Sequence, residues 1–342
     1  MKESARLLIR LGSLGDVVLA TAAANAARSL WGDGCLDVLV KSEWAPIWEG
    51  HPAVRRVHAW RREERGLPGL RRWALRLRAE GYVETFDLQA SSRTRLLAAL
   101  AGLRRVRRPV RHGLARRLLV WTHRWGPPAD YSVAASFART VGVDAVALPS
   151  LHPAEAARAR AATLGVPPGA AGLVPGAKHA TKRWPLERFV ETGRALAAAG
   201  LGPVAVFLGP EEENLLRDWK TLWPEDGNWV ILREDLATVG AVLETLGVVV
   251  ANDTGLAHLA SAAGVRVVVL LGCTVRAFGF VPAGDGHQVL EVADLSCRPC
   301  SLHGSAECPR SHFRCMADID TGPVVSAALS AAAASARASL PM

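Results

Sequence analysis

Residues 248–264 read Val-Val-Val-Ala-Asn-Asp-Thr-Gly-Leu-Ala-His-Leu-Ala-Ser-Ala-Ala-Gly, and this stretch decides the fold of the chain. It begins with an apolar run rich in valine, which is typical of a buried parallel strand. It ends as a helix of small residues, with Gly264 as the expected C-cap. The residues between, Asn-Asp-Thr-Gly at 252–255, favour turns and helix N-caps. The sequence therefore predicts a strand that passes through a tight turn into a helix.

A turn of this kind directs free backbone N–H groups at one point, where the helix dipole adds partial positive charge. His258 follows Thr254 by four residues, so it lies one turn along on the same helix face. Asp253, Thr254, Gly255 and His258 are therefore candidates for binding a phosphate. The alternative is an ordinary strand–helix unit with a capping aspartate and a solvated histidine, since such junctions are common in α/β folds.

The N-terminus repeats the same pattern. Residues 6–11 predict a strand, residues 12–16 (Gly-Ser-Leu-Gly-Asp) a tight loop, and residues 17–30 an alanine-rich helix. The loop has glycine only at Gly12 and Gly15, so the Gly-x-Gly-x-x-Gly fingerprint of dinucleotide-binding proteins is absent. Short strands and helices continue to alternate, which indicates an α/β fold with parallel sheets.

The chain has 342 residues, half of them apolar, which is enough for two α/β domains. Prolines at 153, 167 and 168 mark a hinge. We expect a first domain over residues 1–160, a second over 161–320 and a C-terminal helix within 321–342. In the second domain, residues 175–185 form a loop before a helix that begins near Pro185.

Charge is distributed unevenly. Residues 1–150 hold 25 Lys and Arg against 13 Asp and Glu, whereas residues 151–342 hold 16 against 19. Two arginine-rich segments, 61–78 and 104–124, contain or adjoin tryptophans at 60, 73, 121 and 125. Arginine interleaved with tryptophan suits a membrane interface or a phosphorylated ligand, although a solvated basic face is the alternative. No run of ~18 uncharged apolar residues and no signal peptide are present, so we expect a cytoplasmic protein.

Four of the six cysteines lie close together as Cys297-x2-Cys300-x7-Cys308-x6-Cys315. The first pair has the spacing of metal ligands, and four thiolates would make a structural site with no open position. Buried free thiols are the second reading, and disulfides are the least favoured in a reducing compartment. Cys35 and Cys273 are most simply packing residues.

Several motifs occur in a fixed order: Arg-Leu-Gly-Ser-Leu-Gly-Asp at 10–16, Lys-His-Ala-Thr-Lys-Arg-Trp-Pro at 178–185, Asp-Thr-Gly-x-x-His at 253–258 and Phe-Gly-Phe-x-Pro at 278–282. Together with the Cys/His-rich tail they resemble the ADP-heptose:lipopolysaccharide heptosyltransferases of glycosyltransferase family 9. The resemblance covers residues 6 to about 320. It implies a GT-B architecture, with two Rossmann-like parallel-sheet domains facing a cleft and a C-terminal helix crossing back to the first domain.

The resemblance also implies roles for single residues. Asp16 matches the catalytic aspartate, and Gly12, Ser13 and Gly15 form its acceptor-side loop; an N-cap role for Asp16 is the alternative. Thr181 and Lys182 would hold the donor diphosphate together with Thr254, Gly255 and His258, while Asp253 caps the helix or orients its neighbours. Glu211 would contact the nucleoside ribose, although Glu-Glu-Glu at 211–213 leaves this register open.

The activity implied by the resemblance is inverting transfer of heptose from ADP-heptose to the inner core of lipopolysaccharide, with no cofactor required for catalysis. The acceptor would be an acidic phosphorylated glycolipid, bound by arginines around 61–72 and 104–117 on the cytoplasmic surface of the inner membrane. Some relatives hold iron through four cysteines, so the cysteine cluster is expected to bind structural zinc or iron. Another family-9 acceptor or nucleotide sugar is the alternative. Nucleic acid is not an expected partner, because a nucleic-acid binder would leave the three loops without a role.

Overall fold

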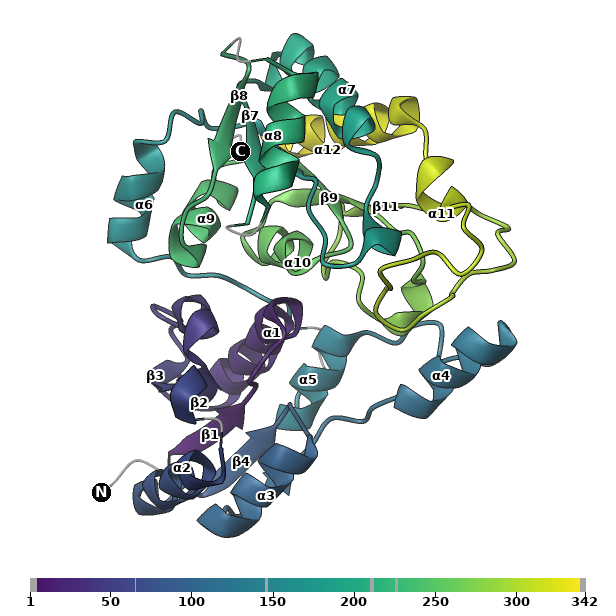
Figure 1. Cartoon of the computed structure of the whole chain (residues 1–342). Helices are drawn as coiled ribbons and strands as arrows, with labels where there is room; N and C mark the ends of the chain where they lie inside the picture. The colour runs from purple at the N-terminus through teal and green to yellow at the C-terminus, as the bar shows by residue number, and fades with distance from the viewer. Residues whose placement is uncertain (1–4, 65, 145–146, 210–211, 225–226, 339–342) are drawn as a thin grey trace. The chain divides into compact units, whose positions relative to one another are not determined.

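The computed structural model describes residues 5–338 except 65, 145–146, 210–211 and 225–226. The chain divides into two compact units (Figure 1). The first comprises residues 1–111 and 133–154, and the second comprises residues 112–132 and 155–342. Both are α/β units built on parallel sheets, which confirms the predicted fold class.

The first unit is a five-stranded sheet with the order β3-β2-β1-β4-β5. Its strands are β1 (Arg6–Ile9), β2 (Leu36–Lys41), β3 (Val54–Trp60), β4 (Glu84–Asp87) and β5 (Val106–Arg107). Its helices are α1 (Leu14–Trp31), α2 (Leu67–Glu80), α3 (Ser92–Ala101) and α5 (Val133–Val141), with 3-10 turns at Ser42–Ile47 and Arg62–Glu64. Helix α1 packs on α5, and α2 packs on α3, so each face of the sheet is covered by a helix pair (Figure 1).

The second unit is a six-stranded sheet with the order β11-β10-β9-β6-β7-β8. Its strands are β6 (Ala171–Val174), β7 (Val204–Phe207), β8 (Trp229–Leu232), β9 (Val248–Asn252), β10 (Arg266–Leu270) and β11 (Gln288–Leu290). Its α-helices are α4 (Gly113–Thr122), α6 (Glu155–Ala162), α7 (Leu186–Leu196), α8 (Glu213–Leu222), α9 (Leu236–Leu243), α10 (Gly255–Ala262), α11 (Arg314–Ala317) and α12 (Thr321–Ala338). A π-helical turn at Ala197–Leu201 continues α7, and 3-10 turns lie at Ala180–Lys182 and Arg276–Phe278.

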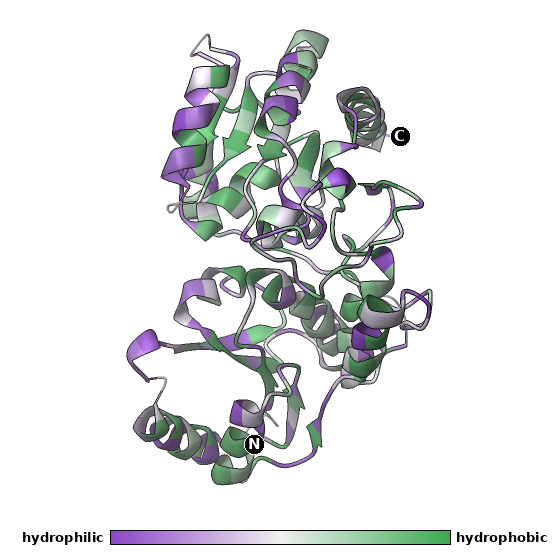
Figure 2. Cartoon of the chain, turned by 45° about the vertical axis from the view of Figure 1, so that its right-hand side comes forward, coloured by the Kyte–Doolittle hydropathy of each residue, from purple (hydrophilic) through white to green (hydrophobic). Residues whose placement is uncertain are grey.

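The central strands of this sheet are buried on both faces, which is why they read as nearly continuous apolar runs. Figure 2 shows these strands coloured as hydrophobic, with polar colour on the outer helices. Helices α7, α8 and α12 contribute to the core on one face of the sheet. The tight packing also explains Gly172 in β6. A Cβ at this position would lie 2.7 Å from Leu246 Cδ1 and 3.1 Å from Phe207 Cε2.

The units differ from the domains expected from the sequence in three respects. Residues 155–160 belong to the second unit and not to the first. Residues 112–132, which contain α4, belong to the second unit although they lie within the first 160 residues. Helix α12 packs on α7, β9 and β10 of the second unit, with Val324 and Ala328 fully buried in its core. The expectation that this helix crosses back to the first domain stays a prediction. Among the described residues, none of the helices has the length and hydropathy needed to span a bilayer.

We predict that Gly172→Ala destabilises the second unit by about 1–3 kcal/mol, because the added methyl overpacks a filled core. The matched control is Gly322→Ala in α12, where a Cβ would meet no atom within 4 Å. This control is expected to be neutral or slightly stabilising. Calorimetric melting of the two variants measures the difference, and equal melting temperatures would show that the strand can shift to accept the methyl.

Candidate active site

The order of strands reverses at one place in each sheet, between β1 and β4 in the first unit and between β6 and β9 in the second. Open parallel sheets bind ligands beyond the carboxyl ends of their strands at such a switch point. The predicted site residues follow these strands: Asp16 comes after β1, Lys182 after β6, and Asp253 and Thr254 after β9. The topology therefore gives each unit one ligand-binding edge.

Asp16 lies in the first turn of α1, which begins at Leu14 with Ser13 as its N-cap. The alternative N-cap role for Asp16 is therefore wrong, because the helix starts two residues earlier. Its Oδ2 accepts a hydrogen bond from Ser13 Oγ at 3.0 Å and forms an ion pair with Arg10 Nη2 at 2.6 Å. Both contacts use Oδ2, and no described residue bonds to Oδ1. The carboxylate is thus held in one orientation with one oxygen available to accept a proton.

Arg10, at the end of β1, is the residue that orients Asp16. It is only 5% exposed, and its Nη1 donates to the Leu88 carbonyl at 2.8 Å. Burial lowers the pKa of Arg10, an effect that the adjacent Asp16 carboxylate opposes. Arg10 belongs to the first sequence motif, at residues 10–16, but the sequence predicted no role for it. The spacing of six residues could not show that the strand end and the helix start face each other.

The loop of Gly12, Ser13 and Gly15 places this aspartate. Gly12 has φ +147°, and a Cβ there would lie 3.1 Å from Trp44 Nε1 and 3.4 Å from Lys41 Nζ. The turn therefore favours glycine for both its backbone and its close neighbours. Gly15 is buried in the first turn of α1.

The N-terminus of α10 is the candidate anion-binding site of the second unit. Its N-cap is Thr254, whose side chain makes no capping hydrogen bond. The Thr254 hydroxyl is buried and has no partner among the described residues. Gly255 begins the helix, and His258 lies one turn along, buried at 5% exposure. An uncapped helix start with an unsatisfied buried hydroxyl suits a bound phosphate.

Lys182 is brought to the same edge by an ion pair. Its Nζ lies 2.6 Å from Asp253 Oδ2, and Thr274 Oγ1 donates to that oxygen at 2.8 Å. Asp253 therefore positions Lys182, in line with the orienting role expected from the sequence. An ammonium has three donors, so Lys182 can bind a phosphate while it keeps this partner. Thr274 was missed, because nothing in the sequence marks a threonine 21 residues after Asp253.

Asn252, the last residue of β9, ties the loops of this edge together. It is fully buried, and its Nδ2 donates to the Pro175 carbonyl at 2.8 Å. Its Oδ1 accepts from the Trp184 backbone N–H at 3.1 Å. One side chain thus fixes the start and the end of the loop that carries Lys182.

Thr181 has a different environment from the one expected of a ligand for the diphosphate. It is 1% exposed, and its hydroxyl donates to the Ser305 carbonyl at 3.1 Å while it accepts from the Ser305 N–H at 2.8 Å. These bonds join the Lys182 loop to the cysteine-rich segment. The Thr181 side chain is therefore structural in this structure, and Lys182 supplies the charge.

Glu211 lies outside the described residues. Its neighbour Glu212 is described, and its Oε2 accepts from the Gly209 N–H at 2.6 Å. The same carboxylate lies against Gly176 in the Lys182 loop, where a Cβ would come within 2.0 Å of Glu212 Oε1. Of the two glutamates in this run that the structure describes, Glu212 lies beside the loop that carries Lys182.

The arginine-rich segments are divided between the two units, because residues 112–124 belong to the second unit. Within the first unit, arginines lie at both edges of the sheet. Arg61 and Arg62 follow the carboxyl end of β3, and Arg108 pairs with Asp87 at the end of β4 at 2.9 Å. Arg104 and Arg105 instead precede β5 and line a cavity of about 930 Å³ with Arg6 and Arg78. These last residues lie at the opposite edge from Asp16 and are removed from the expected acceptor contacts.

All six cysteines are free thiols. Cys273, expected to be a packing residue, forms a hydrogen bond with Cys300 that lowers the pKa of Cys273 to about 6. Burial raises the pKa of Cys315 to about 11. Within the described part of the chain, no three His, Cys, Asp or Glu side chains are arranged to hold a metal ion. Metal binding by Cys297, Cys300, Cys308 and Cys315 stays a prediction of the sequence, and no catalytic step is assigned to it.

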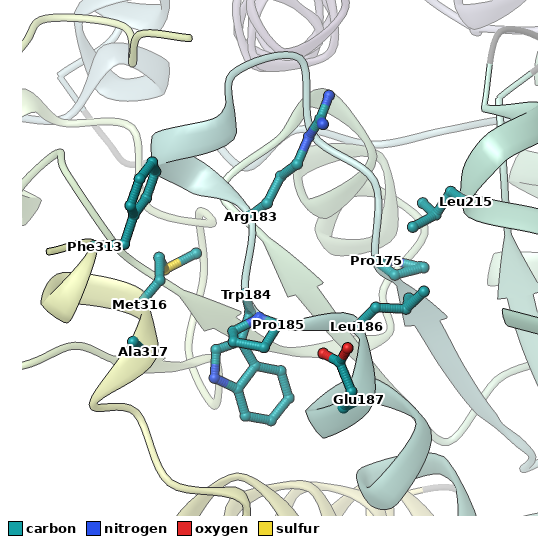
Figure 3. Close-up of a pocket in the computed structure, with 10 residues that line it drawn as sticks. All are labelled: Pro175, Arg183, Trp184, Pro185, Leu186, Glu187, Leu215, Phe313, Met316 and Ala317. Atoms are coloured by element: carbon teal, nitrogen blue, oxygen red, sulfur yellow. The ribbon is translucent and has the colours of Figure 1, made fainter. Parts of the chain in front are cut away.

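A cavity of about 380 Å³ opens beside the Lys182 loop (Figure 3). Its lining is mainly apolar and comprises Pro175, Arg183, Trp184, Pro185, Leu186, Glu187, Leu215, Phe313, Met316 and Ala317. Arg183 is directed along the loop and donates from Nε to the Ala177 carbonyl at 2.7 Å. The cavity therefore suits a ring or another apolar group better than a diphosphate.

Two parallel-sheet units with ligand-binding edges at their switch points define a GT-B glycosyltransferase fold, and comparison with known proteins agrees. The model of glycosyltransferase family 9 (heptosyltransferase) matches residues 70–309. Lipopolysaccharide heptosyltransferase 1 of Pseudomonas aeruginosa is 30% identical over 315 residues, which is 86% of this chain and 85% of that protein. The chain belongs to glycosyltransferase family 9, the heptosyltransferases, and is an enzyme.

Solved structures show the same fold. E. coli ADP-heptose lipopolysaccharide heptosyltransferase II superposes with a TM-score of 0.77 at 16% identity, covering 96% of this chain and 99% of that one. An E. coli heptosyltransferase with ADP-2-deoxy-2-fluoro heptose gives a TM-score of 0.61 at 22% identity, covering 88% and 96%.

We predict that Asn252→Ala lowers the free energy of unfolding by at least about 2 kcal/mol, because it leaves two buried backbone groups unpaired. Urea denaturation measures the loss, and hydrogen exchange at the Trp184 amide should accelerate. Asn214→Ala is the control, because Asn214 is exposed on α8 and, among the described residues, pairs only with Arg217. Its effect should stay within about 0.5 kcal/mol. Unchanged exchange at Trp184 in the Asn252 variant would contradict the clamping role.

Proposed function

We propose that the protein transfers heptose from ADP-heptose to the inner core of lipopolysaccharide with inversion at the anomeric carbon. The observation that carries this proposal is the uncapped N-terminus of α10 beside the Lys182–Asp253 ion pair, with the Thr254 hydroxyl unsatisfied. Such an arrangement binds a diphosphate whose charge increases as the sugar departs. The similarity to heptosyltransferases supports heptose as the transferred sugar.

The proposed reaction is a single in-line displacement. The acceptor hydroxyl attacks the anomeric carbon of the heptose and gives its proton to Asp16, while the bond to the diphosphate oxygen breaks. Arg10 and Ser13 hold Oδ2 of Asp16, so Oδ1 receives the proton. Lys182 and the N–H groups of α10 stabilise the negative charge on the departing ADP. No step in this scheme requires a metal.

The remaining assignments follow the geometry of the loops. Glu212, in place of Glu211, contacts the nucleoside, because its carboxylate lies against Gly176. Arg61, Arg62 and Arg108 bind the acidic acceptor, since they lie at the carboxyl edge of the first sheet. The acceptor is a phosphorylated glycolipid, so the enzyme works at the cytoplasmic surface of the inner membrane. Heptose addition to candidate core acceptors, detected by mass spectrometry after incubation with ADP-heptose, tests the activity. No product with any core acceptor would overturn it.

We expect Asp16→Asn to lower kcat about 10²–10⁴-fold, because the amide keeps the shape of the side chain but cannot accept the proton. The dissociation constant for ADP should stay within about twofold, since Asp16 belongs to the other unit. Asp33→Asn, which alters only an exposed pair with Arg28, is the matched control and should have normal kinetics. Normal turnover in Asp16→Asn would remove this residue as the base.

We expect Lys182→Ala to weaken ADP binding about 10–100-fold in titration calorimetry, as is typical for the loss of a charge-assisted hydrogen bond. The variant also leaves the Asp253 carboxylate without its cationic partner. The negative charge of this carboxylate then repels the diphosphate. Lys220→Ala in α8 removes an exposed lysine and should bind ADP normally. An unchanged dissociation constant in Lys182→Ala would exclude the phosphate-binding role.

A further inference from the structure

Helix α4 leaves a large apolar surface in water. None of its ten residues is buried. Leu114 is 71% exposed and Trp121 is 81% exposed, and Trp125, just beyond the helix, is 69% exposed. The chain has eleven tryptophans, and these two are the ones with exposed side chains. Soluble proteins rarely expose such a cluster without a partner for it.

Three of the exposed residues lie on one face of the helix, and two more follow its C-terminus. Leu114, Arg117 and Trp121 follow the i, i+3, i+7 spacing of a helical stripe, and all three are exposed. Arg124 and Trp125 follow the left-handed C-cap at His123 and are exposed as well. We call Leu114, Arg117, Trp121, Arg124 and Trp125 the α4 outer face.

The opposite side of α4 is fixed to the second unit. The Arg116 guanidinium lies over the rings of Tyr131 and Phe280 at 5.1 and 4.9 Å and donates to the Tyr131 hydroxyl at 3.0 Å. His123 Nδ1 lies 3.0 Å from the Arg298 carbonyl oxygen. These contacts, which attach the helix to the second unit, come from residues outside the α4 outer face.

The charge of the α4 outer face is unbalanced. Arg117 and Arg124 form no ion pair with a described residue. No Asp or Glu occurs between Gln89 and Ala129. Cations next to exposed tryptophans match the headgroup region of an anionic bilayer, where indole rings lie at the interface and arginine pairs with phosphate.

We propose that the α4 outer face docks the enzyme on an anionic lipid surface. Trp121, Trp125 and Leu114 enter the headgroup region, and Arg117 and Arg124 contact lipid phosphates. An anionic lipid surface fits better than a protein partner, because the exposed arginines adjoin the tryptophans and no Asp or Glu occurs between Gln89 and Ala129 to balance their charge. The inference rests on the proposed function in one respect: a lipid-linked acceptor gives the docking its purpose.

Co-sedimentation of the full chain with vesicles tests the proposal. The wild type should bind vesicles of phosphatidylcholine with 30% phosphatidylglycerol, bind pure phosphatidylcholine far more weakly, and be released as salt increases. Trp121→Ser with Trp125→Ser should lower the partition coefficient at least about tenfold. Arg117→Gln with Arg124→Gln should lower it about 30-fold on anionic vesicles only.

The matched control is Leu30→Ser with Arg217→Gln, which alters an exposed leucine and an exposed arginine on other helices. It should bind vesicles as the wild type does. Equal binding by the control and both α4 variants would overturn the proposal. Substitutions that convert a dimer to a monomer without lowering vesicle binding would show a contact between copies instead, and would also overturn it.

A transfer assay separates this inference from the proposed function. With a deacylated, water-soluble acceptor, the variant Trp121→Ser with Trp125→Ser should retain wild-type turnover, while its turnover on vesicle-bound acceptor should fall. If the wild type transfers heptose but does not bind anionic vesicles, the docking proposal fails alone. If it binds the vesicles but transfers no heptose to any acceptor, the proposed function fails alone.

Discussion

The donor edge of this protein depends on the buried side chain of Asn252. Its amide pairs with the backbone at Pro175 and at Trp184, so the end of β9 holds both ends of the loop that follows β6. Each bond satisfies a buried backbone group that would otherwise be costly to leave unpaired. The same residue precedes Asp253, and the loop it fixes carries Lys182. The 2.6 Å ion pair between these two residues can therefore form across 71 positions of sequence.

In this arrangement, different residues provide the positive charge and hold it in position. Lys182 provides a cation and the start of α10 provides N–H groups, whereas Asp253 and Thr274 keep the ammonium in place. The Thr181 hydroxyl, adjacent in sequence to Lys182, serves the cysteine-rich segment instead. The donor loop is consequently braced from β9 on one side and from residue 305 on the other. In the proposed reaction, a preorganised set of hydrogen-bond donors of this kind stabilises the departing diphosphate without having to rearrange.

In the first unit, the carboxyl edge of the sheet at the β1–β4 switch point has a different arrangement. In the proposed reaction the base has to be oriented while one of its oxygens stays free. Arg10 and Ser13 both bind Oδ2 of Asp16, which meets this requirement. The glycine at position 12 lets the chain turn beside Trp44 and Lys41. Both edges thus use a doubly wound sheet in the same way, with the reactive groups on the loops that follow the strands at the switch point. The residues on those loops differ between the two units. They are Asp16 in the first unit and Lys182 with Asp253 in the second, so the proposed roles of the two units differ as well.

The sequence by itself determined the α/β class, the parallel strands and the order of the motifs that contain Asp16, Lys182 and Asp253. These features are local: buried strands need apolar runs, and turns into helices need glycine, aspartate and threonine. Only the tertiary structure decided that Arg10 orients Asp16, that Asp253 and Thr274 hold Lys182, and that Glu212 faces the donor loop. It also assigned α4 to the second unit through the contacts of Arg116 and His123. These facts depend on which strands become neighbours. Periodicity and spacing reveal the face of one element but not the side chains that another element brings to it.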